Sequence, residues 1–216
     1  MRIFLTTVSI GLSAVLASAA YADKPAEPKT AVTKTAAKTA APKGPSAREI
    51  AAAQRVAEQQ AAMKALKLVD GDWRGPSKKL TKGDWVAMTQ TEKVDTLMGG
   101  TMRTISSLGY DKDGSLSFES FSVISYDPND KAYSIRTYSG GRPHDYPLEV
   151  TADGFKWEAA AGRKMTIRYQ AMLKDGAWTQ SATRVPASGA PEKYVEFTVK
   201  RGAAVALPAA KKIAAN

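Results

Sequence analysis

The sequence contains no cysteine and only one histidine, His144, among its 216 residues. Without cysteine the chain cannot form a disulfide framework, a thiolate metal site, a cysteine nucleophile or an acylated cysteine anchor. A single histidine beside Asp145, with no nucleophile motif such as G-x-S-x-G, leaves little acid–base or covalent chemistry available. We therefore expect a protein that is not an enzyme, with no catalytic residues, no metal ligands and no cofactor.

Long apolar runs are also scarce, and the one at the amino terminus is too short to span a membrane. Arg2 precedes an apolar stretch of about 14 residues, whereas a spanning helix needs about 20. The stretch is followed by Ala20-Tyr21-Ala22, which has the small-residue spacing of a signal-peptide cleavage site. The sequence thus predicts a cleaved signal peptide over residues 1–22 and a periplasmic or secreted protein. Cleavage after Ala19 and a retained anchor are the alternatives.

Residues 23–47 have almost no large aliphatic side chains and consist mainly of Ala, Lys, Thr and Pro. Such a segment cannot bury enough apolar surface to fold, so it is predicted to be a disordered, positively charged linker. The formal net charge of the chain is +10, and +8 of it lies outside residues 68–201. A folded part so nearly neutral argues against nucleic acid as a partner. The linker is instead expected to act as a solvated tether, with a weak electrostatic contact with the anionic envelope as the alternative.

A helix is predicted over residues 48–67. Ser46 and Glu49 have the capping-box spacing, and the following residues are rich in Ala, Gln, Arg, Lys and Glu with no Gly or Pro. The larger apolar side chains form a thin stripe along this helix. We expect the stripe to cover one end of the next domain.

From residue 68 to residue 201 the apolar pattern changes from helical to alternating. Eight turn signals, for example Asp111-Lys112-Asp113-Gly114, separate short runs of alternating side chains. The pattern predicts eight to ten antiparallel strands in a meander. The expected fold class is all-β, a single antiparallel up-and-down β-barrel preceded by the helix and the linker, with a flexible tail at residues 202–216.

Alternation also predicts which side chains line the barrel. Phe155 and Trp157 flank Lys156, and similar alternation on two later strands directs Tyr169 and Phe197 inward. On the earlier strands, apolar and small hydroxyl residues alternate in a way that suggests a partly polar lining and a retained cavity. The residues predicted to line the cavity and bind a ligand are Trp85, Met102, Thr104, Tyr133, Trp157, Tyr169, Trp178 and Phe197. Core packing is the alternative role for the tryptophans.

The motif Gly71-Asp72-Trp73, combined with Lys200-Arg201 at the other end of the barrel segment, resembles the lipocalin-like (calycin) signature. The spacing L-x-x-G-x-W-x-G over residues 68–75 is most similar to a bacterial exported family annotated only as a domain of unknown function. That family is similar to nitrobindin and fatty-acid-binding-protein-like barrels. The resemblance implies that Trp73 closes one end of the barrel and that Arg201 packs over its indole ring.

Some related barrels bind haem through an axial histidine. Here His144 follows Gly141-Arg142-Pro143 and is expected to lie in a loop rather than at an inward strand position, so haem is not an expected cofactor. Together these observations predict an exported, non-catalytic, lipocalin-like barrel that binds a small hydrophobic or amphipathic ligand. The alternative is a structural or envelope-interaction protein whose barrel is filled by side chains and whose basic linker acts as a tether.

Overall fold

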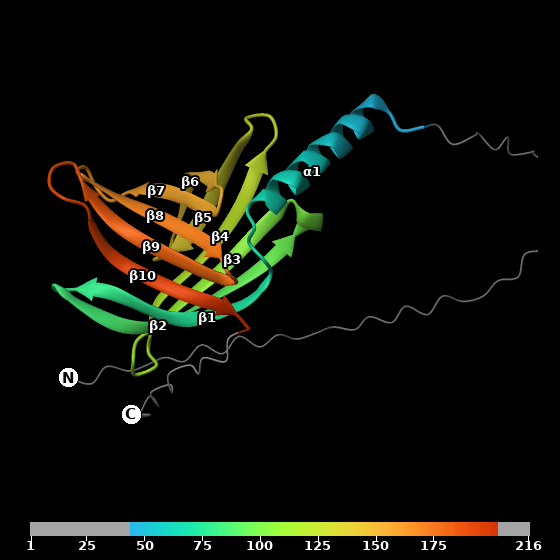
Figure 1. Cartoon of the computed structure of the whole chain (residues 1–216). Helices are drawn as coiled ribbons and strands as arrows, with labels where there is room; N and C mark the ends of the chain where they lie inside the picture. The colour runs from blue at the N-terminus through green and yellow to red at the C-terminus, as the bar shows by residue number, and fades with distance from the viewer. Residues whose placement is uncertain (1–43, 203–216) are drawn as a thin grey trace, which may run out of the picture. The chain divides into compact units, whose positions relative to one another are not determined.

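Ten strands follow one helix along the chain in the computed structural model, which describes residues 44–202 (Figure 1). The helix is α1 (Ala47–Ala65), and a short 3-10 helix, η1 (Met98–Gly100), joins the second and third strands. The strands are β1 (Gly71–Thr81), β2 (Asp84–Leu97), β3 (Met102–Tyr110), β4 (Leu116–Asp127), β5 (Ala132–Ser139), β6 (Arg142–Thr151), β7 (Gly154–Ala160), β8 (Met165–Lys174), β9 (Ala177–Pro186) and β10 (Glu192–Arg201). The predicted signal peptide, the linker up to residue 43 and the tail from residue 203 lie outside the described residues.

Each strand pairs antiparallel with the next, and β1 pairs with β10, which closes the sheet into a barrel. The predicted all-β up-and-down barrel is therefore confirmed, with ten strands. Every predicted turn signal coincides with a connection between strands. The connection without a predicted signal joins β7 to β8 at residues 161–164, where Gly162 has a φ of 85°.

Two glycines allow neighbouring strands to approach closely in the barrel wall. A Cβ atom at Gly75 on β1 would lie 2.0 Å from the carbonyl oxygen of Thr198 on β10. A Cβ atom at Gly154 on β7 would lie 2.1 Å from the carbonyl oxygen of Ala171 on β8. Glycine within a strand often marks such an approach or a bend at a barrel corner. The second glycine of the G-x-W-x-G pattern thus has a steric role in closing β1 against β10.

Helix α1 begins with the predicted capping box, since Glu49 N donates to Ser46 Oγ at 3.3 Å and Ser46 N donates to Glu49 Oε2 at 2.7 Å. It ends at Ala65, two residues earlier than predicted, because Lys67 adopts a left-handed φ of 56° that cannot continue a helix. No helix in residues 44–202 has the length and hydropathy that crossing a bilayer requires.

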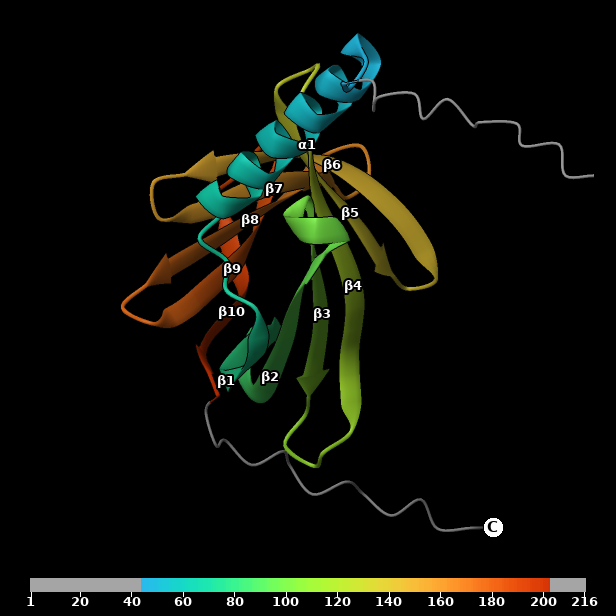
Figure 2. The same cartoon turned by 90° about the vertical axis from the view of Figure 1, so that its right-hand side faces the viewer.

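The second half of α1 covers one end of the barrel, as Figure 2 shows. Met63 is buried at its C-terminal end, and Leu66 and Leu68 just beyond it are buried in the same cluster as Trp73. Polar contacts join the helix, and Lys67 just after it, to η1, to the adjacent ends of β4 and β5, and to the turn between β6 and β7. The donors and acceptors are Gln60 Nε2 to Gly99 O at 2.8 Å, Gln59 Nε2 to Tyr126 O at 3.1 Å, Tyr133 Oη to Ala62 O at 2.9 Å, and Lys67 Nζ to Ala152 O.

Candidate functional site

The barrel encloses a cavity of about 310 Å³ to which all ten strands contribute side chains. Its lining has two chemically different walls. Small hydroxyl side chains on β3, β4 and β5 form one wall: Ser107, Ser117, Ser120, Ser122, Thr137 and Ser139. Mostly aromatic side chains from β6 to β10 form the other: Tyr146, Trp157, Tyr169, Trp178, Tyr194 and Phe197. A cavity with one hydroxyl wall and one aromatic wall suits an amphipathic molecule.

The aromatic wall is ordered by ring contacts. Trp157 and Tyr169 lie on adjacent strands with their rings 4.6 Å apart and nearly parallel, at 6°. Trp178 meets Phe197 edge to face, with ring centroids 5.8 Å apart. Trp178 is only 1% exposed, and its Nε1 atom has no hydrogen-bond partner among the described residues. This wall therefore offers a flat apolar surface together with one unused buried donor.

A single carboxyl group lies at the inner end of the cavity. Glu92 on β2 is 3% exposed and is paired in the strand register with Trp73, which belongs to the closed end of the barrel. Its Oε1 atom accepts a hydrogen bond from Gln90 Nε2 at 2.8 Å, and its Oε2 atom accepts one from Ser107 Oγ. Burial raises the pKa of Glu92 from 4.5 to about 8, although these two hydrogen bonds oppose the shift.

The other formally charged side chain of the cavity lining is Lys79 on β1. Its Nζ atom forms an ion pair with Asp111 Oδ1 at 3.0 Å, at the hairpin between β3 and β4. Lys79 is paired in the register with Val86, near the opposite end of β1 from Trp73. Phe118, which is 46% exposed, lies at the same end. The cavity therefore has a carboxyl group at its inner end and a paired lysine and a phenylalanine near its mouth.

Four of the residues predicted to line the cavity do so. These are Trp157, Tyr169, Trp178 and Phe197, on β7, β8, β9 and β10. On β7, β8 and β10 large apolar residues alternate with charged or polar ones, whereas on β9 the positions that follow Trp178 on the same face are Gln180 and Ala182. Trp178 also belongs to the buried core, so the ligand-contact and core roles are not exclusive for this residue.

The other four predicted residues do not line the cavity. Trp85 lies on the outer face of β2, 42% exposed, with Lys78 Nζ 4.7 Å from its ring centre. Met102 and Thr104 are on the opposite face of β3 from the lining residues Ile105 and Ser107, although Thr104 is buried there. Tyr133 is at the helix-covered end, where its hydroxyl bonds to α1.

Tyr133 shares its face of β5 with the lining residues Ile135 and Thr137 but lies at the end that α1 covers. The other three residues differ from the prediction because neither face of β2 or β3 is strongly apolar. When both faces are polar, alternation alone does not say which one is inside, and choosing the other face moves every side chain across the sheet. Glu92 was missed for this reason. Met88, Gln90, Glu92 and Val94 alternate in phase, and the inward position of Val94, which is fully buried, would have identified the correct face.

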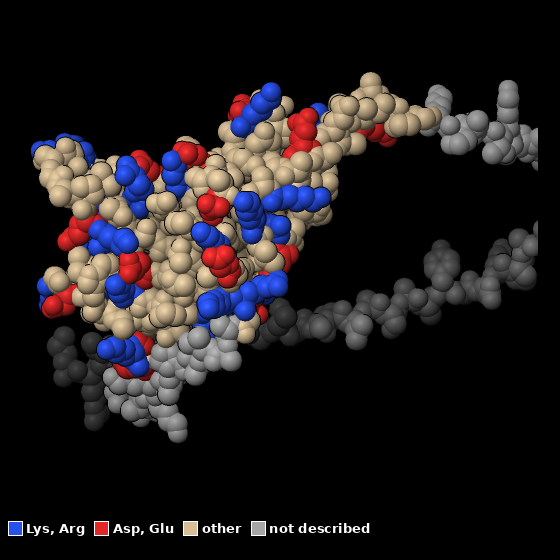
Figure 3. All heavy atoms as spheres, in the orientation of Figure 1, with Lys and Arg blue, Asp and Glu red and all other residues tan. Residues whose placement is uncertain are grey.

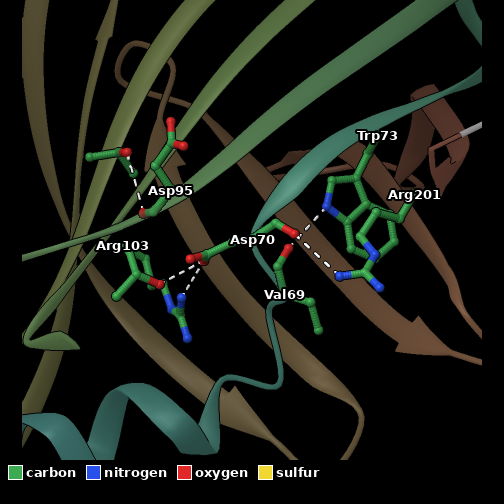
Figure 4. Close-up of polar contacts among 8 residues, drawn as sticks. Val69, Asp70, Trp73, Asp95, Arg103 and Arg201 are labelled. Atoms are coloured by element: carbon green, nitrogen blue, oxygen red, sulfur yellow. Dashed lines mark hydrogen bonds and ion pairs between the residues drawn. The ribbon is translucent and has the colours of Figure 1, made fainter.

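The closed end is built around Trp73 (Figure 4). Trp73 is 5% exposed, its Nε1 atom donates to Val69 O at 3.1 Å, and its ring meets Trp178 edge to face at 6.1 Å. Arg201 is its partner in the β1–β10 register, and the arginine side chain passes Gly71. The Arg201 guanidinium donates to Asp70 O at 3.4 Å. The cation–π pairs found in residues 44–202 involve Lys78, Arg136 and Arg184, so the expected guanidinium–indole stacking is replaced by this hydrogen bond.

A second set of polar contacts at this end joins Asp70 to β2 and β3. Asp70 Oδ1 accepts hydrogen bonds from Thr96 Oγ1 at 2.6 Å and from Arg103 (Figure 4). Partial desolvation acts against ionisation, but these contacts lower the pKa of Asp70 overall. Arg136 and Arg168 form ion pairs outside the cavity, with Asp145 and Glu158. The cavity lining includes no arginine.

His144 lies on β6 and not in a loop, which corrects the expectation from the sequence. The dipeptide Gly140-Gly141 makes the turn by itself, so the strand already begins at Arg142. His144 is exposed, and its ring stacks on Tyr146 with centroids 6.0 Å apart and an angle of 13°. In residues 44–202 no group of three or more His, Cys, Asp or Glu side chains could hold a metal ion.

Acidic and basic side chains are mixed over the face of the barrel seen in Figure 3. In residues 44–202 several charged side chains are paired across neighbouring strands, for example Lys78 with Glu196 at 2.8 Å and Lys156 with Glu149 at 2.8 Å. Pairing between exposed groups of this kind adds little stability. The mixture of signs in Figure 3 forms no continuous basic stripe on this face, which agrees with the nearly neutral charge of residues 68–201.

No family model matches the chain, and no curated protein sequence matches it. Among solved structures, the chain is similar to the crystal structure of Rv2717c from M. tuberculosis, with a TM-score of 0.49 and 10% sequence identity. The match covers 67% of this chain and 98% of the other.

Proposed function

We propose that this protein is a non-catalytic, lipocalin-like barrel that binds one small, partly apolar molecule in its cavity. The observation that carries the proposal is the cavity of about 310 Å³ with its hydroxyl and aromatic walls. A barrel with a purely structural role has no need of such a space, because ordinary cores are packed almost without voids. The buried Nε1 atom of Trp178 supports the same proposal, because a buried donor without a partner is costly unless a ligand or water satisfies it.

Filling the cavity is expected to abolish binding while leaving the fold intact. The neutral, environment-sensitive dye N-phenyl-1-naphthylamine is expected to bind the parent protein at a stoichiometry of one. Ser120→Leu adds two heavy atoms to the hydroxyl wall and is expected to weaken dye binding at least about tenfold, the loss that about 1.4 kcal/mol of steric conflict produces. Fluorescence titration measures both quantities.

The matched control is Ser134→Leu, which makes the same substitution on the outer face of β5, at an exposed position. This variant is expected to bind the dye as the parent does. Native mass spectrometry of protein purified from the envelope fraction is expected to show a co-purifying small molecule in the parent and not in Ser120→Leu. Equal dye binding by the two leucine variants, or no binding by the parent, would favour the structural, envelope-tethering role instead.

We also propose that the protein is exported and acts in the periplasm, with its basic linker in weak contact with the anionic envelope. The support is the arrangement of Arg2, the short apolar run and Ala20-Tyr21-Ala22. Amino-terminal sequencing of the mature protein is expected to begin near Asp23. Recovery of protein that retains Met1 in the cytosol would contradict export.

A further inference from the structure

The contacts of Glu92 are those of a carboxylate whose countercharge is missing. Both carboxyl oxygens accept hydrogen bonds, from Gln90 Nε2 and from Ser107 Oγ. Two donors suit an ionised carboxylate, whereas in the neutral carboxyl group one oxygen carries a proton that the hydroxyl oxygen of Ser107 can accept. Among residues 44–202, Glu92 has no ion-pair partner within 4.0 Å.

The cations on the neighbouring strands are engaged elsewhere or point outward. On β1, Lys79 faces the cavity but is paired with Asp111, and Lys78 is paired with Glu196 on the outer face. On β3, Arg103 is bound to Asp70 at the closed end. Across the cavity, the titratable groups are the phenols of Tyr146, Tyr169 and Tyr194. Burial raises the pKa of Tyr146 and of Tyr169, which keeps these two phenols neutral.

A buried carboxylate without a countercharge is strongly disfavoured, and a bound cation would remove that penalty. The cavity surroundings suit an organic cation and not a bare metal ion. Glu92 is the one carboxylate in the lining, whereas metal ions require several ligands. The aromatic wall supplies the apolar surface that the body of such a ligand would contact, and aromatic faces also attract cations.

Building on the proposed function, we propose that the cavity binds a small organic amine, with its ammonium group on Glu92 at the inner end and its apolar body against the aromatic wall. Glu92 is then the residue that selects the head group of the ligand. The hydroxyl wall completes the hydrogen bonds of the ammonium group, which has up to three donors to satisfy. Binding converts the neutral carboxyl group into a carboxylate and releases its proton to solvent.

Three probes with one skeleton and different head groups test the proposal. They are 3-phenylpropylamine, 3-phenylpropan-1-ol and 3-phenylpropanoic acid, each titrated into the full mature protein by isothermal calorimetry at pH 9. The amine is expected to bind at least about tenfold more tightly than the alcohol, and the acid more weakly than either. Charge-assisted hydrogen bonds are strong enough to account for a preference of this size.

The variant Glu92→Gln keeps the shape of the side chain, removes its charge and replaces one acceptor oxygen by an NH2 donor. It is expected to lower the affinity for the amine at least about tenfold and to change the affinity for the alcohol by less than about threefold. Glu119→Gln removes one exposed carboxylate from the outer face of β4 and serves as the control for net charge. This control variant is expected to bind all three probes as the parent does.

A further measurement on the parent protein needs no variant. The carboxyl group of Glu92 must lose its proton when the amine binds, and with a pKa of about 8 it ionises mostly between pH 7 and pH 9. The affinity for the amine is therefore expected to rise about tenfold over this pH range. Calorimetry at pH 7 in buffers of different ionisation enthalpy is expected to show close to one proton released per amine bound. A pH-independent affinity would overturn the proposal.

The outcomes separate this inference from the proposed function. If the alcohol or the acid binds as tightly as the amine, or if Glu92→Gln retains amine affinity, the preference for amines is wrong and cavity binding stands. If none of the three probes binds while the dye binds the parent and not Ser120→Leu, the amine proposal again fails alone. If the dye also fails to bind, both proposals fall.

Discussion

Raising the pH from 6 to 9 is expected to lower the free energy of unfolding by about 3 kcal/mol through Glu92 alone. The pKa of this carboxyl group is about 8 in the folded protein, against an ordinary value of 4.5. At pH values between 4.5 and about 8, Glu92 is ionised in the unfolded chain but keeps its proton in the folded barrel. Stability therefore falls by up to about 1.4 kcal/mol for each pH unit in this range, and the loss is complete above about pH 8.

The other groups with shifted pKa values change the stability at pH values outside this range. The pKa values of Asp70 and Glu196 are lowered, by their hydrogen bonds and ion pairs, so their contributions are complete once pH exceeds the ordinary values of 3.8 and 4.5. Urea unfolding of the parent and of Glu92→Gln at pH 6, 7, 8 and 9 measures the effect. The variant is expected to be nearly insensitive to pH over this range and more stable than the parent at pH 9. Parallel pH profiles for the two proteins would show that the carboxyl group is not buried.

Trp73→Ala is expected to lower the free energy of unfolding by about 3 to 5 kcal/mol, as for other core aromatics. Trp73 is 5% exposed, contacts Trp178 edge to face and donates to Val69 O. Truncation removes these contacts at the point where the segment after α1 enters β1 and where β1 meets β10. Urea unfolding at pH 6 measures the loss without interference from the ionisation of Glu92.

The matched control is Trp85→Ala, which removes the same side chain from the outer face of β2, where it is 42% exposed. Its contact with Lys78 is a surface cation–π pair, so its loss is expected to cost no more than about 1 kcal/mol.

Arg201→Ala is expected to cost clearly less than Trp73→Ala, since Arg201 is exposed and makes one long hydrogen bond. A double-mutant cycle is expected to show coupling of at least about 0.5 kcal/mol between Trp73 and Arg201, which are register neighbours. Equal losses for the two tryptophan variants would mean that the barrel is closed elsewhere.

The strand meander could be predicted from the sequence because its turns carry local signals. Gly83, Gly114 and Gly176 lie at hairpin connections and all have positive φ values, which glycine adopts without strain. The turn between β7 and β8 escaped prediction because Gly162 stands there without the neighbouring Asp, Asn or Pro that marked most other turns. The capping box of α1 is equally local, since Ser46 and Glu49 are three residues apart.

The inward faces could be predicted only where one face of a strand is clearly apolar. On β7, β8 and β10 large apolar residues alternate with charged ones, and Trp157, Tyr169 and Phe197 accordingly line the cavity. On β2 and β3 both faces carry polar residues, so alternation did not distinguish Trp85 from Glu92. Which of these faces is buried depends on the pairing of β1 with β10 and on the helix over the barrel end.

The sequence by itself determined the order of the elements, the helix start, the antiparallel meander and the near-neutral charge of the barrel, because each depends on composition or on residues close together in the chain. Only the tertiary structure decided that Glu92 is the buried carboxyl group of a two-walled cavity. Trp178 reaches that cavity from β9, far along the chain from β2, and Glu92 owes its raised pKa to burial among such residues. Closure of the barrel decides which side chains are removed from water, and residues close together in the sequence do not determine that closure.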